Sequence, residues 1–150
     1  MTQIDFYQLG QAGLEATLSQ LLKKTAAAEK KALILCPKPA AVGIDDALWS
    51  HEADGWIPHG LDDGEGVDFA TVWISSDMSA NRIKADFLFL LHGSEPASWD
   101  GFSRVFCLFD GRSEAQLQQA RSQWTQWKAG NDFDLGYFAQ NAEGGWDKKA

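Results

Sequence analysis

Three histidines and their acidic neighbours are the side chains best suited to bind a metal ion. His51 and His59 lie eight residues apart in the segment "SHEADGWIPHGLDD", and His92 follows thirty-three residues later. Zinc sites usually show tighter spacing, such as two histidines four residues apart on one helix. The spacing therefore favours structural or surface histidines, and we expect no bound metal. A small metal-dependent hydrolase that uses His51, His59 and the nearby aspartates is the alternative.

The sequence shows no other arrangement typical of an enzyme. Cys36 and Cys107 lie inside the apolar runs "ALILC" and "VFCLF", which is typical of buried reduced thiols, although a disulfide between them is a second interpretation. There is no G-x-S-x-G nucleophile elbow and no phosphate-binding Walker motif, and the glycine-rich "GLDDGEG" is acidic and would repel phosphate. We therefore predict a non-enzymatic protein with no cofactor and no ATP hydrolysis. A degenerate nucleotide-binding regulator would instead be stabilised by ATP or GTP.

The segment 113–130 carries residues that could bind an acidic peptide. At about 100° per residue on a helix, Leu117, Arg121, Trp124 and Lys128 share one narrow face. An aromatic ring between two cations suits a peptide that ends in an apolar residue and a free carboxylate. In the alternative interpretation Trp124 only packs, and the two cations lie in solvent with their stems over apolar surface.

The charge distribution supports a local binding role rather than general nucleic-acid binding. The chain has a formal net charge of −8, whereas a nucleic-acid binder needs a basic face that displaces counterions from phosphates. Residues 101–130 nevertheless hold four basic side chains against two acidic ones. A basic region on an acidic protein suits an acidic ligand better than a long polyanion.

The stretch "ALWSHEADGWIPHG" (47–60) places two tryptophans in a segment rich in turn residues. Trp49 is expected at the end of a short helix, and Trp56 follows Gly55 directly. Large aromatic side chains often dominate binding energy at interfaces. We therefore predict that Trp49 and Trp56 form a second interaction surface; the alternative is that one or both stabilise the core.

The segments that must position these side chains alternate between strands and helices. The predicted strands are 4–9, 32–36, 71–75, 85–93 and 103–111, with a short one at 56–58. A helix follows the first strand, with Leu14, Leu18, Leu21 and Leu22 on one face. "PKPAAVG" is expected to break the chain before a short helix at 44–50, which would hold Asp45 and Asp46 in its first turn.

The helix at 113–130 is the most clearly marked element of the sequence. Ser113 and Gln116 form an S-x-x-Q capping box, and Gly130 marks the end of the helix. The remaining residues 131–150 are expected to form a polar tail with aromatic side chains.

Together these elements predict a single α/β domain over residues 1–150, with a mostly parallel sheet between helices on both faces. The N-terminus is unlike a signal peptide, and no apolar run reaches the ~18–20 residues needed to cross a bilayer. We therefore expect a cytoplasmic protein with no membrane contact.

The order of motifs resembles the chi subunit of the bacterial DNA polymerase III holoenzyme, a clamp-loader accessory protein. The similar pieces are the strand "FYQL", the leucine helix leading to "KKALILC", the stretch "IDDALWS…WIPHG", then "LFDG", "ARSQWTQWKAG" and the closing "GGWDKKA". The resemblance covers nearly the whole chain and is weaker between about residues 62 and 100. It implies a nucleotide-binding-like topology that lacks a phosphate loop.

The resemblance implies a non-catalytic accessory subunit that binds the acidic C-terminal tail of single-stranded DNA-binding protein. Such a protein links the clamp loader to coated template and associates with single-stranded DNA only indirectly. On this basis we expect Arg121, Trp124 and Lys128 to bind the tail, with Phe109 at the edge of the pocket. The resemblance also implies that aromatic positions matching Trp49 and Trp56 bind a psi-like clamp-loader subunit or a helicase.

Overall fold

The computed structural model describes residues 2–10, 13–50, 59–62, 64–67, 70–130, 132–143 and 145–150, without the side chains of 48–50 and 59. The strands are β1 (Thr2–Leu9), β2 (Ala32–Leu35), β3 (His59–Leu61), β4 (Val72–Ser75), β5 (Phe87–Leu91), β6 (Arg104–Asp110), β7 (Phe133–Gln140) and β8 (Trp146–Lys148). The helices are α1 (Leu14–Ala27), α2 (Lys38–Ser50) and α3 (Glu114–Ala129).

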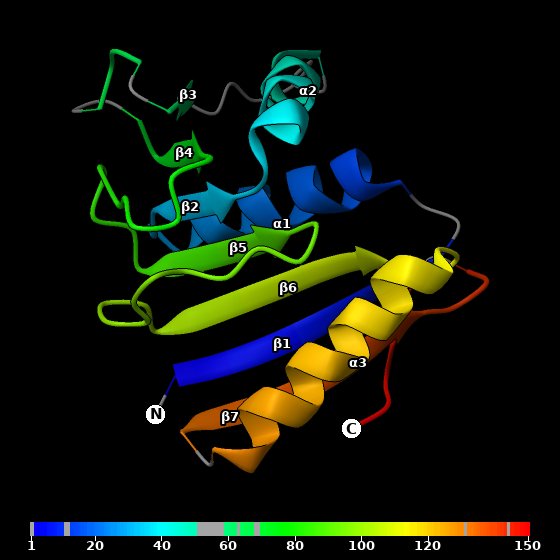
Figure 1. The fold of residues 1–150 in the computed structure, drawn as a ribbon. Coiled ribbons are helices and arrows are strands. Elements are labelled where there is room, and N and C mark those ends of the chain that lie inside the picture. The colour runs from blue at the N-terminus through cyan, green and yellow to red at the C-terminus, as the bar shows by residue number, and fades with distance from the viewer. Residues whose placement is uncertain are drawn as a thin grey trace.

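The strands form one eight-stranded sheet in the order β3-β4-β2-β5-β6-β1-β7-β8 (Figure 1). All neighbouring pairs are parallel except β7 and β8, which are antiparallel. β1 lies inside the sheet, between β6 and β7, so the first strand pairs with strands from the last third of the chain. The expected mostly parallel α/β sheet is confirmed.

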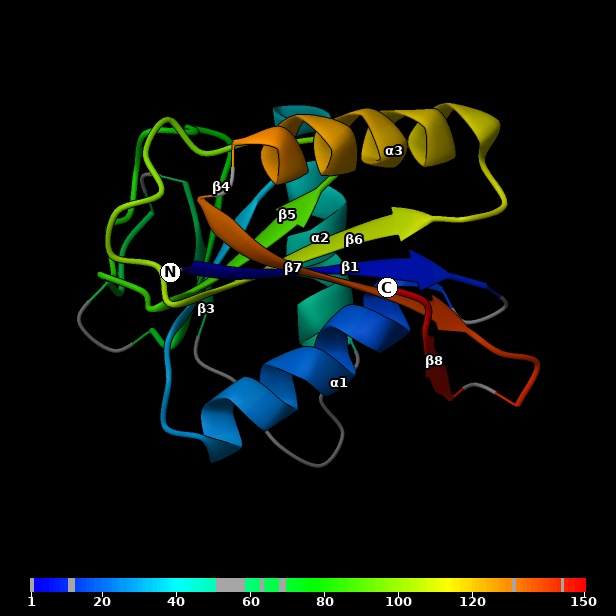
Figure 2. The same ribbon diagram turned by 90° about the horizontal axis from the view of Figure 1, so that it is seen from below.

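Helices cover both faces of this sheet, and each face has its own core (Figure 2). The core under α3 contains Ile4 and Phe6 of β1 together with Ala120 and Trp127 of the helix. The opposite core joins the buried leucines of α1 to the α2 residues Ala41 and Ile44. Strand β2 is buried on both faces, as its continuous apolar run predicts.

Helix α2 begins earlier than expected, so the predicted break at "PKPAAVG" is wrong. The helix begins at Lys38, and the Pro37 carbonyl accepts hydrogen bonds from the backbone N–H groups of Ala40 and Ala41. Pro39, in the first turn, is compatible with a helix, because its missing N–H would have no intrahelical partner there. Asp45 and Asp46 consequently lie inside the helix rather than in its first turn.

The C-terminal segment also differs from expectation, because 131–150 contains the strands β7 and β8 rather than a polar tail. In "FDLGYFA", Phe133, Leu135 and Tyr137 occupy alternate positions and pack against the core under α3. This period-two pattern is typical of a strand with one buried face. The predicted strand at 56–58 lies outside the described residues.

Helix α3 confirms the predicted boundaries and half of the predicted capping box. The Ser113 hydroxyl accepts a hydrogen bond from the Gln116 N–H. The Gln116 side chain does not return to Ser113; its Oε1 accepts from the Asp110 N–H at 2.9 Å. The helix ends at Ala129, next to Gly130. Gln116 thus ties the start of α3 to the end of β6.

A buried carboxylate, Asp5, forms an ion pair with the half-buried Arg104 on the α1 face of the sheet, next to a glycine of β7. Asp5 is 2% exposed, and its Oδ2 lies 3.0 Å from a terminal guanidinium nitrogen of Arg104. Gly136 lies opposite Asp5 in the β1–β7 register. A Cβ atom at Gly136 would lie 2.4 Å from the Asp5 Oδ1 atom. The sheet therefore needs a glycine at this position to hold the carboxylate.

We predict that Gly136→Ala lowers the free energy of unfolding by about 1–3 kcal/mol, because the added methyl group overpacks a buried charge. Gly43→Ala is the control, since a Cβ atom there meets nothing within 4 Å. That change in helix α2 should stabilise the protein by about 0.4–1 kcal/mol. Chemical denaturation of both variants measures the difference, and equal stabilities would contradict the close approach at Gly136.

Candidate functional site

The exposed face of α3 forms a pocket together with the end of the chain. The hollow has a volume of about 560 Å³ and is lined by Arg121, Trp124, Thr125, Lys128, Tyr137 and Ala150. We call it the α3 pocket. The three α3 residues singled out from the sequence, Arg121, Trp124 and Lys128, therefore lie in one pocket. Tyr137 and Ala150 come from the segment that was expected to be a tail.

Phe6 supports the aromatic wall of the α3 pocket from the sheet below. Its ring centroid lies 5.5 Å from that of Trp124, 5.6 Å from that of Trp127 and 6.3 Å from that of Tyr137. Trp124 and Tyr137 also meet edge to face at 5.8 Å. Phe6 is fully buried, whereas Trp124 and Tyr137 are half-buried. The two pocket rings thus continue the core outward to the surface.

The charged atoms of the pocket lie above this aromatic wall. The Lys128 Nζ atom lies 5.5 Å from the centroid of the Trp124 ring, a cation–π arrangement. Arg121 and Lys128 are exposed on the helix surface. Burial raises the pKa of the Tyr137 phenol, and the positive charge of Arg121 partly offsets that rise. Tyr137 is therefore a neutral phenol near pH 7, and its hydroxyl donates a hydrogen bond to the Gln8 side chain.

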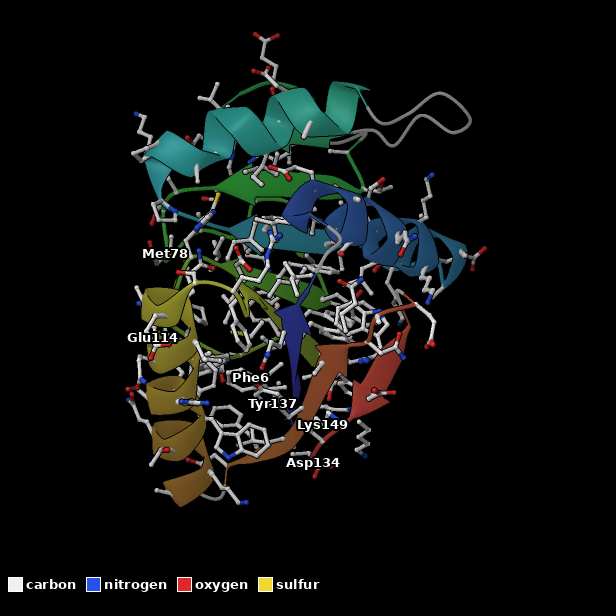
Figure 3. All side chains as sticks on the ribbon, turned by 90° about the vertical axis from the view of Figure 1, so that its right-hand side faces the viewer. Phe6, Met78, Glu114, Asp134, Tyr137 and Lys149 are labelled. Carbon is white, nitrogen blue, oxygen red and sulfur yellow. The ribbon has the colours of Figure 1, made fainter. Side chains whose placement is uncertain are left out.

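The segment after β8 closes one side of the pocket. The Lys149 N–H donates to the Tyr137 carbonyl at 2.7 Å, and the Tyr137 N–H donates to the Ala150 carbonyl at 3.1 Å. Figure 3 shows Tyr137 beside Phe6, between α3 and the segment that carries Lys149. Sequence reasoning missed Tyr137, although its place in the alternating run "FDLGYFA" could have indicated a strand residue on the α3 face.

Phe109 does not line the α3 pocket, contrary to its expected place at the edge. It is 5% exposed, within the core under α3. Its ring meets Tyr137 edge to face at 6.1 Å. Strand alternation explains this position, because Val105, Cys107 and Phe109 all point to the same buried side of β6. Phe109 therefore supports Tyr137 from behind.

A second hollow, of about 420 Å³, lies where the carboxyl ends of β1 and β6 meet the first turns of the helices. Open α/β sheets bind nucleotides at such a position. Here the lining includes Glu15, Asp110 and His92, and the Arg112 Nε atom is 3.2 Å from the Asp110 carboxylate. The acidic side chains are unfavourable for a phosphate group.

The other predicted residues lie partly outside the described structure. Trp49 belongs to α2, but its side chain is not described, and Trp56 lies outside the described residues, as does His51. His59 begins β3, again without a described side chain. Within the described residues, no group of three histidine, cysteine, aspartate or glutamate side chains could hold a metal ion.

Among the described residues, neither the cysteines nor the helices indicate a further site. Cys36 and Cys107 are buried and free, and burial raises their thiol pKa values to about 11 and about 12. No α-helix in these ranges combines the length and apolar character required to cross a bilayer.

The fold and this pocket define a class of protein: a mostly parallel α/β domain whose surface hollow is cationic and aromatic. A comparison with family models gives the family. The chain belongs to the DNA polymerase III chi subunit (HolC) family, whose model matches residues 1–133. This confirms the resemblance and defines an accessory subunit of DNA polymerase III. A search of curated proteins found no match.

The two tryptophans of α3 should differ in their contribution to stability. Trp127 is 5% exposed, so we predict that Trp127→Ala lowers the free energy of unfolding by about 3–5 kcal/mol. Trp124→Ala should cost clearly less, because part of that ring already contacts water. Urea denaturation of the two variants tests this, and an equal loss would show that Trp124 is a core residue.

Proposed function

We propose that the α3 pocket binds the acidic C-terminal tail of single-stranded DNA-binding protein. The observation that carries this proposal is the convergence of Arg121, Trp124 and Lys128 with Tyr137 in one open hollow. Through this contact the protein links the clamp loader to coated template, and it associates with single-stranded DNA only indirectly. Binding of this kind needs no cofactor and no catalysis, and it takes place in the cytoplasm.

The chemistry of the pocket suits the end of an acidic peptide. Arg121 can hold a terminal carboxylate with two parallel N–H donors, and Lys128 adds a second positive charge. The Trp124 and Tyr137 rings offer apolar surface to the last side chain of the peptide. Both rings are held by Phe6, so little ordering cost remains when the ligand binds.

We further propose that Trp49 and Trp56 bind a different partner, a psi-like clamp-loader subunit or a helicase. Trp49 is close to the C-terminal end of α2, whose residues Ala41 and Ile44 pack on the α1 face of the sheet. The α3 pocket lies on the opposite face. The position of α2 therefore supports two partners bound to one subunit at the same time.

Removing the guanidinium of Arg121 tests the tail pocket. Loss of a charge-assisted contact costs on the order of 1.5–3 kcal/mol. We therefore predict that Arg121→Ala weakens binding of a synthetic peptide of the cognate tail at least tenfold, measured by calorimetric titration. Added salt should also weaken binding to the unmodified protein.

Arg112→Ala is the matched control for this experiment. Arg112 is an exposed cation near the start of α3, but it pairs with Asp110 and lines the other hollow. Its removal changes the net charge by the same amount and should leave peptide affinity nearly unchanged. Equal weakening by both variants would indicate a general charge effect and would remove Arg121 from the site.

The double variant Trp49→Ala/Trp56→Ala tests the second surface. If the pair is an interface, the melting temperature of the free protein should stay nearly unchanged while capture of a clamp-loader or helicase partner is lost. If the pair stabilises the core, truncation should cost about 3–5 kcal/mol and lower the melting temperature sharply. Thermal unfolding beside a binding assay with the purified partner separates the two results.

A further inference from the structure

The outer edge of β7 is paired over only part of its length. On its inner side β7 pairs with β1 from Phe133 to Ala139. On its outer side β8 pairs with residues 138–140, and the segment after β8 bonds to Tyr137. In the described part of the chain, no strand pairs with residues 133–136 on the outer side. This half of the edge is open.

The backbone groups of this open edge point outward at two positions. Successive residues of a strand direct their N–H and C=O groups to alternate sides. Tyr137 directs both groups outward, to Ala150 and Lys149. Leu135 and Phe133, two and four residues earlier, therefore direct theirs outward as well. Unpaired groups in such a row are a template for an added strand.

The open edge leads directly to the α3 pocket. Tyr137 lines the pocket, and its outward backbone groups bond to the segment after β8. The unpaired stretch 133–136 ends directly beside it. The Leu135 and Phe133 side chains pack on the α3 side of the sheet. A peptide running parallel to β7, past Phe133 and then Leu135, would arrive at Tyr137 with its carboxyl end beside Arg121.

We propose that the acidic peptide held in the α3 pocket extends along this edge as an additional parallel strand, bonded to Phe133 and Leu135. This inference rests on the proposed function. Two observations favour this occupant: the edge is continuous with the pocket, and the exposed cations Arg121 and Lys128 line that pocket. Backbone bonds of this kind supply affinity, while the pocket supplies specificity.

One exposed acidic side chain lies on the open edge and limits which peptide residue can lie beside it. Asp134 alternates with Phe133 and Leu135, so it points to the α1 face of the sheet. An acidic peptide side chain directly beside Asp134 on that face would be repelled. Replacement of this carboxylate should therefore tighten binding if the peptide lies along the edge, and should change nothing if the peptide stays inside the pocket.

The first test changes the peptide and leaves the protein intact. A set of tail peptides, each with one N-methylated backbone amide, is titrated against the full chain. Strand pairing predicts alternation: methyl groups on amides that face β7 weaken binding at least tenfold, and those on the amides between them have little effect. If the affinities of the methylated peptides do not alternate in this way, the proposal is wrong.

The second test changes the edge itself. Leu135→Pro and Leu135→Ala both lose the leucine contacts, but only proline removes the outward N–H. Proline is tolerated at this position because that N–H has no partner within the sheet. The proline variant should bind the peptide at least tenfold more weakly than the alanine variant. Asp134→Asn should bind several-fold more tightly than the unmodified protein. Equal affinities throughout overturn the proposal.

The results also separate this proposal from the function on which it rests. If the unmethylated peptide does not bind at all, the proposed function and the added strand both fail. If it binds and Arg121→Ala weakens it, but methylation shows no alternation, only the added strand fails. If sedimentation instead shows a dimer that Leu135→Pro abolishes while peptide affinity stays unchanged, the edge belongs to a second copy of this chain.

Discussion

The α3 pocket depends on the packing of one buried ring, Phe6 of β1. Its contacts with Trp124, Trp127 and Tyr137 join the central part of the sheet, the helix and the outer strand in one aromatic cluster. Aromatic pairs of this kind contribute about 0.5–1.5 kcal/mol each beyond the area they bury. Because the same ring orients both Trp124 and Tyr137, the walls of the pocket cannot move independently of the core.

The electrostatics of the protein act on two length scales. The whole chain carries a net charge of −8, which at long range disfavours an acidic partner. At physiological ionic strength the Debye length is about 8 Å, so charges farther away are largely screened. Arg121 and Lys128 lie within contact distance of a ligand in the pocket and are the charges that matter there. The proposed binding of an acidic peptide would therefore depend on short-range charges and would weaken with added salt.

The parts of the site that the sequence predicted are those within one helix. Arg121, Trp124 and Lys128 recur at helical spacing, so their common face follows from local geometry alone. Tyr137 could not be placed in the same way, because it reaches the pocket through the pairing of β7 with β1 rather than through nearby sequence. Phe109 was misplaced for a different reason: its alternation with Cys107 already indicates a buried position on β6.

The position of β1 has a consequence for synthesis of the protein. Gln3 pairs with Arg104, and Thr2 with Phe133, so β1 leaves the ribosome well before either of the strands that flank it. Until then the apolar side chains of β1 have no sheet to enter, and contacts over such long separations form slowly. The nascent chain thus exposes the apolar side chains of β1 until β6 and β7 have been made, and unpaired strands of this kind are prone to aggregate.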